Sequence, residues 1–165
     1  IGISRVDSWQ ELPAAIEEAA SHAPKVIIEA MITGPEVECG VLEREDGTVV
    51  ASSPAMLQGT DAGEEGFYGF DAKYLDDTVS ATIPAPLDEE TTRRVQQLAI
   101  ETYRALDCTG LARVDFFVTD AGPVLNETNT MPGFTPISMY PQMFLADGVS
   151  YADLLTTLVS GARRH

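Results

Sequence analysis

The chain has 165 residues, of which 44% are hydrophobic and 22% are charged, so it has enough apolar material for one packed core and is not a disordered tail. Its 10 basic and 26 acidic residues give a formal net charge of -16, which disfavours nucleic acid and membranes as partners because their phosphates repel an acidic surface. No apolar run approaches the roughly 20 residues of a membrane-spanning helix. We therefore expect a soluble, cytoplasmic protein whose two cysteines are structural thiols.

The first part of the chain predicts a helix followed by a short strand. Apolar residues recur every three or four positions from residue 8 to residue 22, and Pro13 favours a helix that starts near this proline, because proline lacks the N–H that an interior position needs. Residues 26–28 are wholly apolar, which is typical of a short buried strand.

A hairpin and a long loop follow. Residues 37–42 and 48–51 flank Asp46 and Gly47, a dipeptide that favours a hairpin because it tolerates positive φ, so we expect an antiparallel pair there. From residue 58 to 77, glycines are mixed with acids and aromatics without a sustained period, which is typical of a long functional loop or lid.

Two later helices have clear start signals. Asp88 is placed to cap a helix that runs to about Leu106, with one apolar and one charged face. Ser150 and Asp153 form the cap of a final helix, which Gly161 ends. Helices and hairpins together predict a chain with both helices and antiparallel strands.

A second hairpin carries the strongest chemical signal. If its turn comprises the three residues 120–122, paired residue numbers sum to 242. Asp115 then lies opposite Glu127, and Arg113 lies opposite Asn129. Side chains alternate between the two faces of a strand, so this register brings four polar groups together on one face of the sheet.

These four groups predict a metal site. Facing carboxylates repel unless a cation lies between them, and the oxygens of Asp115, Glu127 and Asn129 suit a hard ion such as Mg²⁺. Because Mg²⁺ leaves positions for substrate phosphates, the arrangement indicates nucleotide-dependent phosphoryl transfer. The alternative is an ordinary solvent-exposed sheet face, although both strands are otherwise strongly apolar. A register shift of one residue would exclude the metal site.

The same residues resemble those of the D-alanine:D-alanine ligases, a family within the ATP-grasp enzymes. The matching stretches are KVIIEAMITGPEVECGVLE at 25–43, FYGFDAKYL at 67–75, GLARVDFF at 110–117 and NETNTMPGFTPISMYP at 126–141. They follow the family's order over nearly the whole chain, which is similar to the C-terminal half of such an enzyme.

This resemblance implies an α+β ATP-grasp fold, with a mostly antiparallel sheet flanked by helices. Residues 1–35 would end the central, lid-bearing subdomain, and residues 36–165 would form the C-terminal catalytic subdomain. The implied reaction is ATP-dependent ligation of two D-alanines through an acyl phosphate, for peptidoglycan precursor synthesis. ATP and two Mg²⁺ ions, with Mn²⁺ as a substitute, are the implied cofactors, and the complete enzyme would be a homodimer. A polypeptide that begins at Ile1 is expected to be inactive alone.

The resemblance also implies the roles of the hairpin residues. Asp115, Glu127 and Asn129 would hold the two metal ions. Arg113 and the backbone N–H of Gly133 would form the oxyanion hole for the tetrahedral intermediate, a role that suits a fixed cation and a permissive turn residue.

Further roles concern the substrates. Ser138 and Met139 match positions that seat the carboxylate of the second D-alanine. Lys73 would approach the γ-phosphate from the lid, and Tyr74 would close over the substrates. The residues implied to bind ATP, which include an adenine-reading hinge, a ribose-binding acid and two aromatic walls, are Glu29, Ala30, Met31, Ile32, Glu36, Phe67, Lys73, Phe117 and Asn126.

Other interpretations remain open. A D-alanine:D-lactate ligase or another carboxylate-amine ligase would use the same fold, although Lys73 and Tyr74 favour the dipeptide product. A non-catalytic nucleotide-binding fragment would bind Mg-ATP without turnover. A plain acidic interaction module leaves the convergence of polar groups on the second hairpin unexplained.

Overall fold

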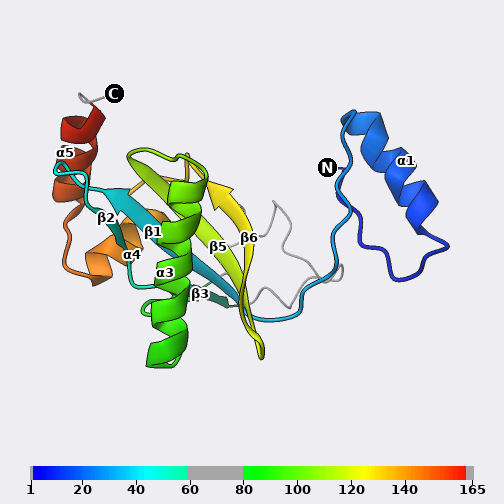
Figure 1. Cartoon of the computed structure of the whole chain (residues 1–165), viewed down its shortest axis with the longest axis horizontal. Coiled ribbons are helices and arrows are strands. Elements are labelled where there is room, and N and C mark those ends of the chain that lie inside the picture. The colour runs from blue at the N-terminus through cyan, green and yellow to red at the C-terminus, as the bar shows by residue number, and fades with distance from the viewer. Residues whose placement is uncertain (1, 59–79, 163–165) are drawn as a thin grey trace. The chain divides into compact units, whose positions relative to one another are not determined.

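The structure is a computed structural model that describes residues 2–58 and 80–162 (Figure 1). The chain divides into two compact units, Ile1–Ile32 and Thr33–His165. In the first unit, helix α1 spans Leu12–His22 and has Pro13 in its first turn, which confirms the predicted helix start. No helix among the described residues is long and apolar enough to cross a membrane.

The prediction of a buried strand at residues 26–28 is wrong. Ile27 is 74% exposed and Ile28 is 63% exposed, and neither belongs to a strand. A strand needs a neighbouring strand to satisfy its backbone N–H and C=O groups. The described part of the first unit contains no strand, so this apolar segment has nothing to pair with there.

The second unit is built on an antiparallel sheet of six strands in its described residues. The central strand β1 pairs with β2, β3 and β5, while β4 pairs with β3 and β6 pairs with β5. The strands are β1 (Glu36–Glu43), β2 (Val49–Ala51), β3 (Ala55–Gln58), β4 (Ser80–Thr82), β5 (Leu111–Thr119) and β6 (Gly122–Asn129). The predicted first hairpin is confirmed, because β1 and β2 are antiparallel and Gly47 between them has φ +83°.

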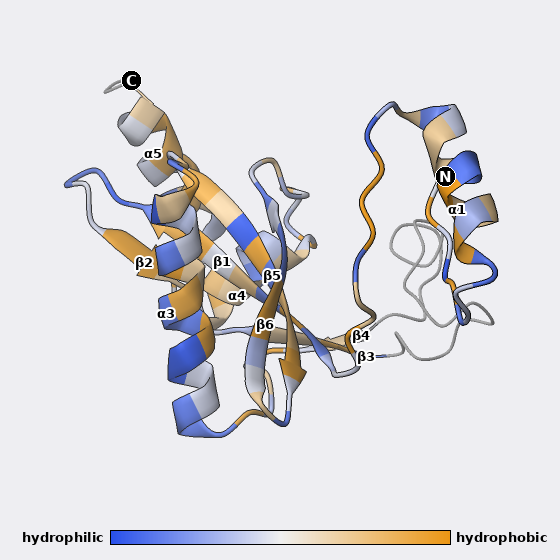
Figure 2. Ribbon diagram, turned by 45° about the vertical axis from the view of Figure 1, so that its right-hand side comes forward, coloured by the Kyte–Doolittle hydropathy of each residue, from blue (hydrophilic) through white to orange (hydrophobic). Residues whose placement is uncertain are grey.

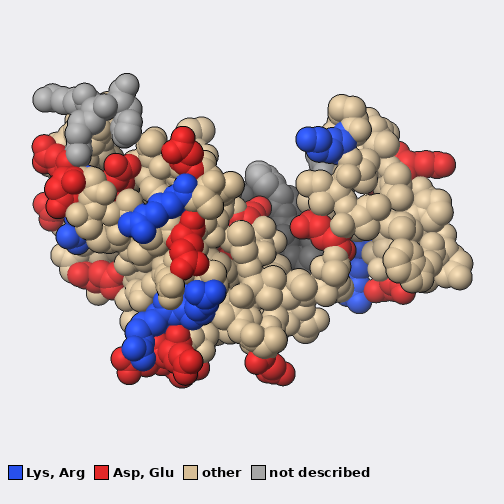
Figure 3. Space-filling view, in the orientation of Figure 1, with Lys and Arg blue, Asp and Glu red and all other residues tan. Residues whose placement is uncertain are grey.

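Helix α3 (Glu89–Ala105) covers one face of this sheet and carries both apolar and polar residues (Figure 2). Its buried residues Val95, Ala99 and Tyr103 pack on the apolar face of β1 and β5. The backbone N–H of Thr91 donates to the carboxylate of Asp88 at 2.8 Å, so the predicted cap is present. Acidic and basic side chains are interspersed on the molecular face to which α3 belongs (Figure 3).

Helices α4 (Met139–Ala146) and α5 (Tyr151–Gly161) pack against one end of the opposite face. Tyr140 and Phe144 of α4 are buried in a cluster with Leu42 of β1, and the Tyr140 hydroxyl donates to the Val41 carbonyl at 2.9 Å. Polar side chains of β1, β5 and β6 lie on the same face of the sheet, beyond the part that α4 and α5 contact. This part of the face holds the candidate site.

Candidate active site

The hairpin of β5 and β6 forms as predicted, but its turn is one residue shorter. Thr119 pairs with Gly122, so the loop comprises residues 120–121 and the paired numbers near the turn sum to 241. A β-bulge between Asp115 and Phe116 then shifts the register by one residue. Beyond the bulge the paired numbers sum to 242, which is the predicted value.

The bulge therefore restores the predicted pairing at the four polar residues of the candidate site. Asp115 lies opposite Glu127, and Arg113 lies opposite Asn129. The extra residue of β6 is Asn126, which falls between the residues that pair with Phe116 and Asp115 and is exposed. An error in the predicted turn and an unpredicted bulge cancel at the site.

The four polar groups are joined by hydrogen bonds. Arg113 donates from Nε to Oδ1 of Asp115 at 2.8 Å and from Nη2 to Oδ2 at 2.7 Å, which is a bidentate ion pair. Asn129 donates from Nδ2 to Oδ2 of Asp115 and to Oε1 of Glu127, both at 3.1 Å. The structure thus brings together the residues that the sequence predicts as metal ligands and as the catalytic arginine.

Burial strengthens the electrostatic interactions within this network. Asp115 is fully buried, the Arg113 side chain is 14% exposed, and Glu127 lies at the exposed edge. Burial opposes the charged form of Arg113, but its hydrogen bonds to Asp115 and the negative charges of Glu38, Asp115 and Glu127 outweigh that effect. The pKa of Arg113 is therefore raised above its ordinary value, and its charge is permanent.

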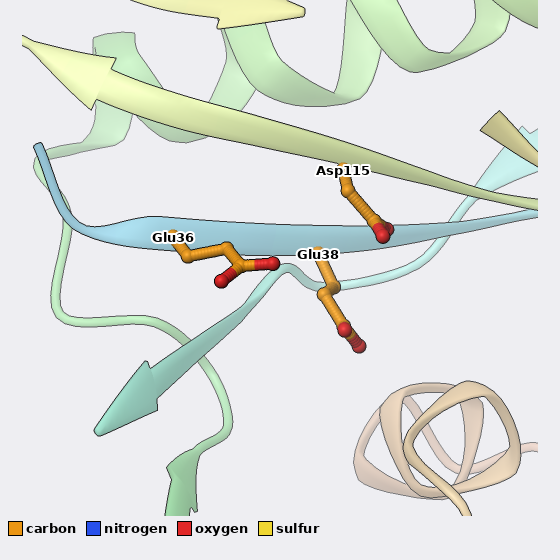
Figure 4. A group of neighbouring side chains, drawn as sticks. All are labelled: Glu36, Glu38 and Asp115. Atoms are coloured by element: carbon orange, nitrogen blue, oxygen red, sulfur yellow. The ribbon is translucent and has the colours of Figure 1, made fainter. Parts of the chain in front are cut away.

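Strand β1 contributes two further acids that face the same site. Glu36, Glu38 and Asp115 are buried, and one carboxylate oxygen of each lies within 4.8 Å of the others. Their side chains leave β1 and β5 on the side of the sheet away from α3 (Figure 4). With Glu127, the described residues bring four carboxylates to this region, and three of them, Glu38, Asp115 and Glu127, act electrostatically on Arg113. This excess of negative charge and oxygen ligands fits a hard divalent cation.

Sequence reasoning missed Glu38. Its signal was the alternation of Glu36 and Glu38 along an otherwise apolar strand, since a period of two places both acids on one face. Only the pairing of Glu38 with Asp115 across β1 and β5 shows that this face is the one occupied by Arg113.

The turn before α4 brings together the predicted residues of the substrate carboxylate and the oxyanion hole. Ser138 is the residue that precedes α4, and Met139 is the first residue of that helix. A Cβ built on Gly133 would lie 3.1 Å from Oγ of Ser138, so Gly133 and Ser138 are direct neighbours. The backbone N–H of Thr135 donates to Oγ of Ser138 at 3.0 Å, which closes the turn.

The predicted ATP-binding residues lie in different parts of the chain. Glu36 pairs with Phe117 across β1 and β5, so these two are adjacent on the sheet. Residues 29–32 lie in the first unit, in a segment without strand or helix, and Met31 is 60% exposed.

The predicted lid residues are the remaining group. Phe67, Lys73 and Tyr74 lie outside the described residues, as does most of the predicted loop.

Comparisons with known proteins identify the family of the chain. The family model described as "D-ala D-ala ligase C-terminus" matches residues 1–160. The chain is 95% identical over 165 residues to a D-alanine–D-alanine ligase of Corynebacterium urealyticum, covering all of this chain and 46% of that protein. It is 57% identical over 164 residues to the enzyme of Mycobacterium avium, covering 98% of this chain and 44% of that protein. The chain thus spans about half the length of the curated relatives it matches.

Solved structures give the same result. The VanG D-Ala:D-Ser ligase from Enterococcus faecalis has a TM-score of 0.78 and 38% identity, over 96% of this chain and 45% of that chain. The D-alanine-D-alanine ligase from Coxiella burnetii has a TM-score of 0.78 and 34% identity, over 95% of this chain and 40% of that chain. The α+β architecture, an antiparallel sheet flanked by helices, is therefore the ATP-grasp fold of these ligases. The chain belongs to the D-alanine–D-alanine ligase family, to whose C-terminal part it corresponds.

Proposed function

We propose that this chain forms the C-terminal catalytic part of an ATP-dependent ligase that joins two D-alanines into D-alanyl-D-alanine, for the synthesis of peptidoglycan precursors. The observation that carries the proposal is the convergence of Arg113, Asp115, Glu127 and Asn129 on one sheet face. The names of the relatives support the substrate, and a relative from Bacillus anthracis was solved in complex with ATP.

In this proposal Asp115, Glu127 and Asn129 hold two Mg²⁺ ions, for which Mn²⁺ could substitute. When bound, Mg²⁺ would neutralise the negative charge of the ATP phosphates. The donor set supports this role, because it offers two carboxylates and one amide oxygen, and the neighbouring Glu36 and Glu38 raise the local negative charge. Nδ2 of Asn129 faces Asp115 and Glu127 here, so cation binding requires this amide to present its oxygen.

Arg113 is the residue proposed to stabilise the oxyanion of the second step, together with the N–H of Gly133. Its Nε and Nη2 atoms face Asp115 and Glu38. Among the described residues Nη1 has no hydrogen-bond partner, so its N–H groups are the donors available to a substrate oxygen. A permanent, oriented charge of this kind acts without reorganisation when the oxyanion forms.

The reaction proceeds in two steps. The carboxylate of one D-alanine attacks the γ-phosphate of ATP and releases ADP, and the amine of the second D-alanine then displaces phosphate from the acyl phosphate. Ser138 and Met139 seat the second D-alanine, while Lys73 and Tyr74 belong to the lid that excludes water. No covalent bond to the protein is needed.

The remaining assignments are part of the same proposal. The adenine contacts the hinge at residues 29–32, with Phe67 and Phe117 as walls and Glu36 at the ribose, and Asn126 is a further ATP-binding residue. Residues 1–35 belong to the central subdomain and residues 36–165 to the catalytic one. The complete enzyme is cytoplasmic and homodimeric, without nucleic acid or membrane partners.

Phosphate release tests the proposal. The protein, produced at its natural length, is incubated with Mg-ATP and D-alanine, with L-alanine as the control, and the dipeptide is detected by mass spectrometry. Release that requires D-alanine and yields one dipeptide per phosphate supports the ligase. Binding of Mg-ATP without release under all conditions would instead indicate a nucleotide-binding protein without ligase activity.

A neighbouring ligase is the second candidate, because the VanG relative from Enterococcus faecalis is a D-Ala:D-Ser ligase at 38% identity. D-serine and D-lactate are therefore offered together with D-alanine in the same assay. A mixed product in excess of D-alanyl-D-alanine at equal concentrations would assign the second substrate differently.

A further inference from the structure

Glu38 is a buried acid in the site to which no role has been assigned so far. It is 3% exposed and lies opposite Asp115 in the pairing of β1 with β5. Its Oε1 atom is 3.3 Å from Nη2 of Arg113, while the Arg113 side chain itself is 14% exposed. A buried carboxylate is costly unless a cation pairs with it, and Arg113 is the cation that the described residues place beside it.

We infer that Glu38 is a positioning residue that holds Arg113 in the orientation required for ligation. The inference rests on the proposed function. Arg113 is held by carboxylates from two strands. Asp115, on its own strand, accepts hydrogen bonds from Nε and Nη2, and Glu38, on β1, forms an ion pair with Nη2. The pair with Asp115 sets the plane of the guanidinium, and the contact from β1 sets its direction across the sheet.

The two carboxylates are not equivalent, because Asp115 has a second proposed task. As a proposed Mg²⁺ ligand, Asp115 would share its negative charge between the guanidinium and the cation, which weakens its hold on Arg113. Glu38 lies outside the proposed ligand set of Asp115, Glu127 and Asn129, and it forms an ion pair with Arg113, so we assign its charge mainly to that guanidinium. When the metal ions and substrates are bound, Glu38 therefore holds Nη2 in place and leaves Nη1 free to donate to the substrate.

The test compares two glutamates of the same strand in the protein at its natural length. Glu38→Gln keeps the size of the side chain and removes its charge. Glu43→Gln is the matched control, because the Glu43 carboxylate accepts from the Tyr103 hydroxyl at 3.2 Å and from the Gly110 N–H at 3.3 Å, away from Arg113. We expect E38Q to lower kcat by about 10–100-fold, as is usual for residues that orient catalytic groups. The KM for ATP should change by less than about twofold in E38Q, and E43Q should change neither kcat nor KM by more than about twofold.

A double-mutant cycle separates positioning from a general structural role. Arg113→Lys keeps the charge but cannot form the bidentate pair. If Glu38 acts through Arg113, adding E38Q to R113K lowers kcat little further, whereas independent effects multiply. The Nε–H resonance of Arg113 in ¹H–¹⁵N spectra gives a readout without turnover: E38Q shifts or broadens it, and E43Q leaves it in place.

The outcomes distinguish the two proposals. Wild-type kcat in E38Q, or multiplicative losses in the cycle, would overturn the inference while the ligase remains. Absence of D-alanine-dependent release in the wild type would overturn the proposed function, and the Arg113 resonance would still decide whether Glu38 orients the guanidinium. If E38Q fails to fold, Glu38→Asp replaces it; it keeps the charge, withdraws the carboxylate by one methylene, and gives the same loss of kcat if the contact matters.

Discussion

Gly40 on β1 lets α4 pack closely on the sheet, and its replacement by alanine tests that packing. A Cβ at this position would lie 2.8 Å from Cε2 of Phe144, and 3.2 Å from both Cε2 of Tyr140 and Oγ of Ser52. Carbon atoms in good contact are about 3.5–4.0 Å apart, so the Phe144 ring must move by roughly 0.7 Å or more. Phe144 is 2% exposed and Tyr140 is fully buried, so neither ring can move without α4.

Overpacking of this kind costs about 1–3 kcal/mol. Alanine is otherwise favoured over glycine in a strand by about 0.5–1 kcal/mol, so we expect Gly40→Ala to lower the free energy of unfolding by about 1 kcal/mol net. With a urea m-value of about 2 kcal/mol/M, the midpoint falls by roughly 0.5 M. The assay is urea unfolding followed by circular dichroism.

The control is Gly161→Ala at the end of α5, where no described residue lies within 4 Å of the new Cβ. This control leaves the midpoint unchanged or raises it by up to about 0.5 M, because alanine is favoured over glycine in a helix and the added methyl group meets no described neighbour. An unchanged midpoint in Gly40→Ala would show that α4 does not rest on β1 as closely as the distances indicate, and would refute the packing argument.

Three further predictions concern the site, the thiols and pH. Glu127→Gln lowers D-alanine-dependent phosphate release by about 100-fold or more while the urea midpoint stays unchanged, because it removes the charge of an exposed metal ligand; full activity would reject the ligand assignment. Iodoacetamide modifies the half-exposed Cys108 in the native protein and Cys39 only after unfolding, since burial raises the pKa of Cys39 to about 12; equal labelling by mass spectrometry would contradict this. The pKa of Asp88 is lowered by the N–H of Thr91, so its charged cap stabilises the fold above about pH 4 and this contribution is lost as pH falls through the folded-state pKa. Asp88→Asn therefore flattens the fall in the unfolding midpoint below about pH 4, and an unchanged slope would exclude the cap as its source.

The helices illustrate what local sequence can predict. The cap at Asp88, the helix start at Pro13 and the cap at Ser150 depend on hydrogen bonds and φ angles within a few residues, and all three are present. Residues 26–28 show the opposite case, because a strand depends on a partner that the local pattern does not contain.

The second hairpin lies between these cases. The predicted pairing of Asp115 with Glu127 is correct, although it was obtained from an incorrect turn. The bulge that compensates for the turn was not predicted, because the alternation of residues contains no signal for it. The sequence did contain a signal for Glu38, but its spacing of two residues from Glu36 showed only that both side chains lie on the same face of the strand.

The sequence by itself determined the helices α1, α3 and α5, the two hairpins, the family resemblance and the residues proposed as metal ligands, because these depend on local spacing and on residue chemistry; helix α4 was not predicted. The tertiary structure alone decided the bulge at Asp115 and the pairing of β1 with β5, which places Glu38 beside Arg113. Contacts between strands that are far apart in the chain depend on sheet order and register, and no local pattern specifies either.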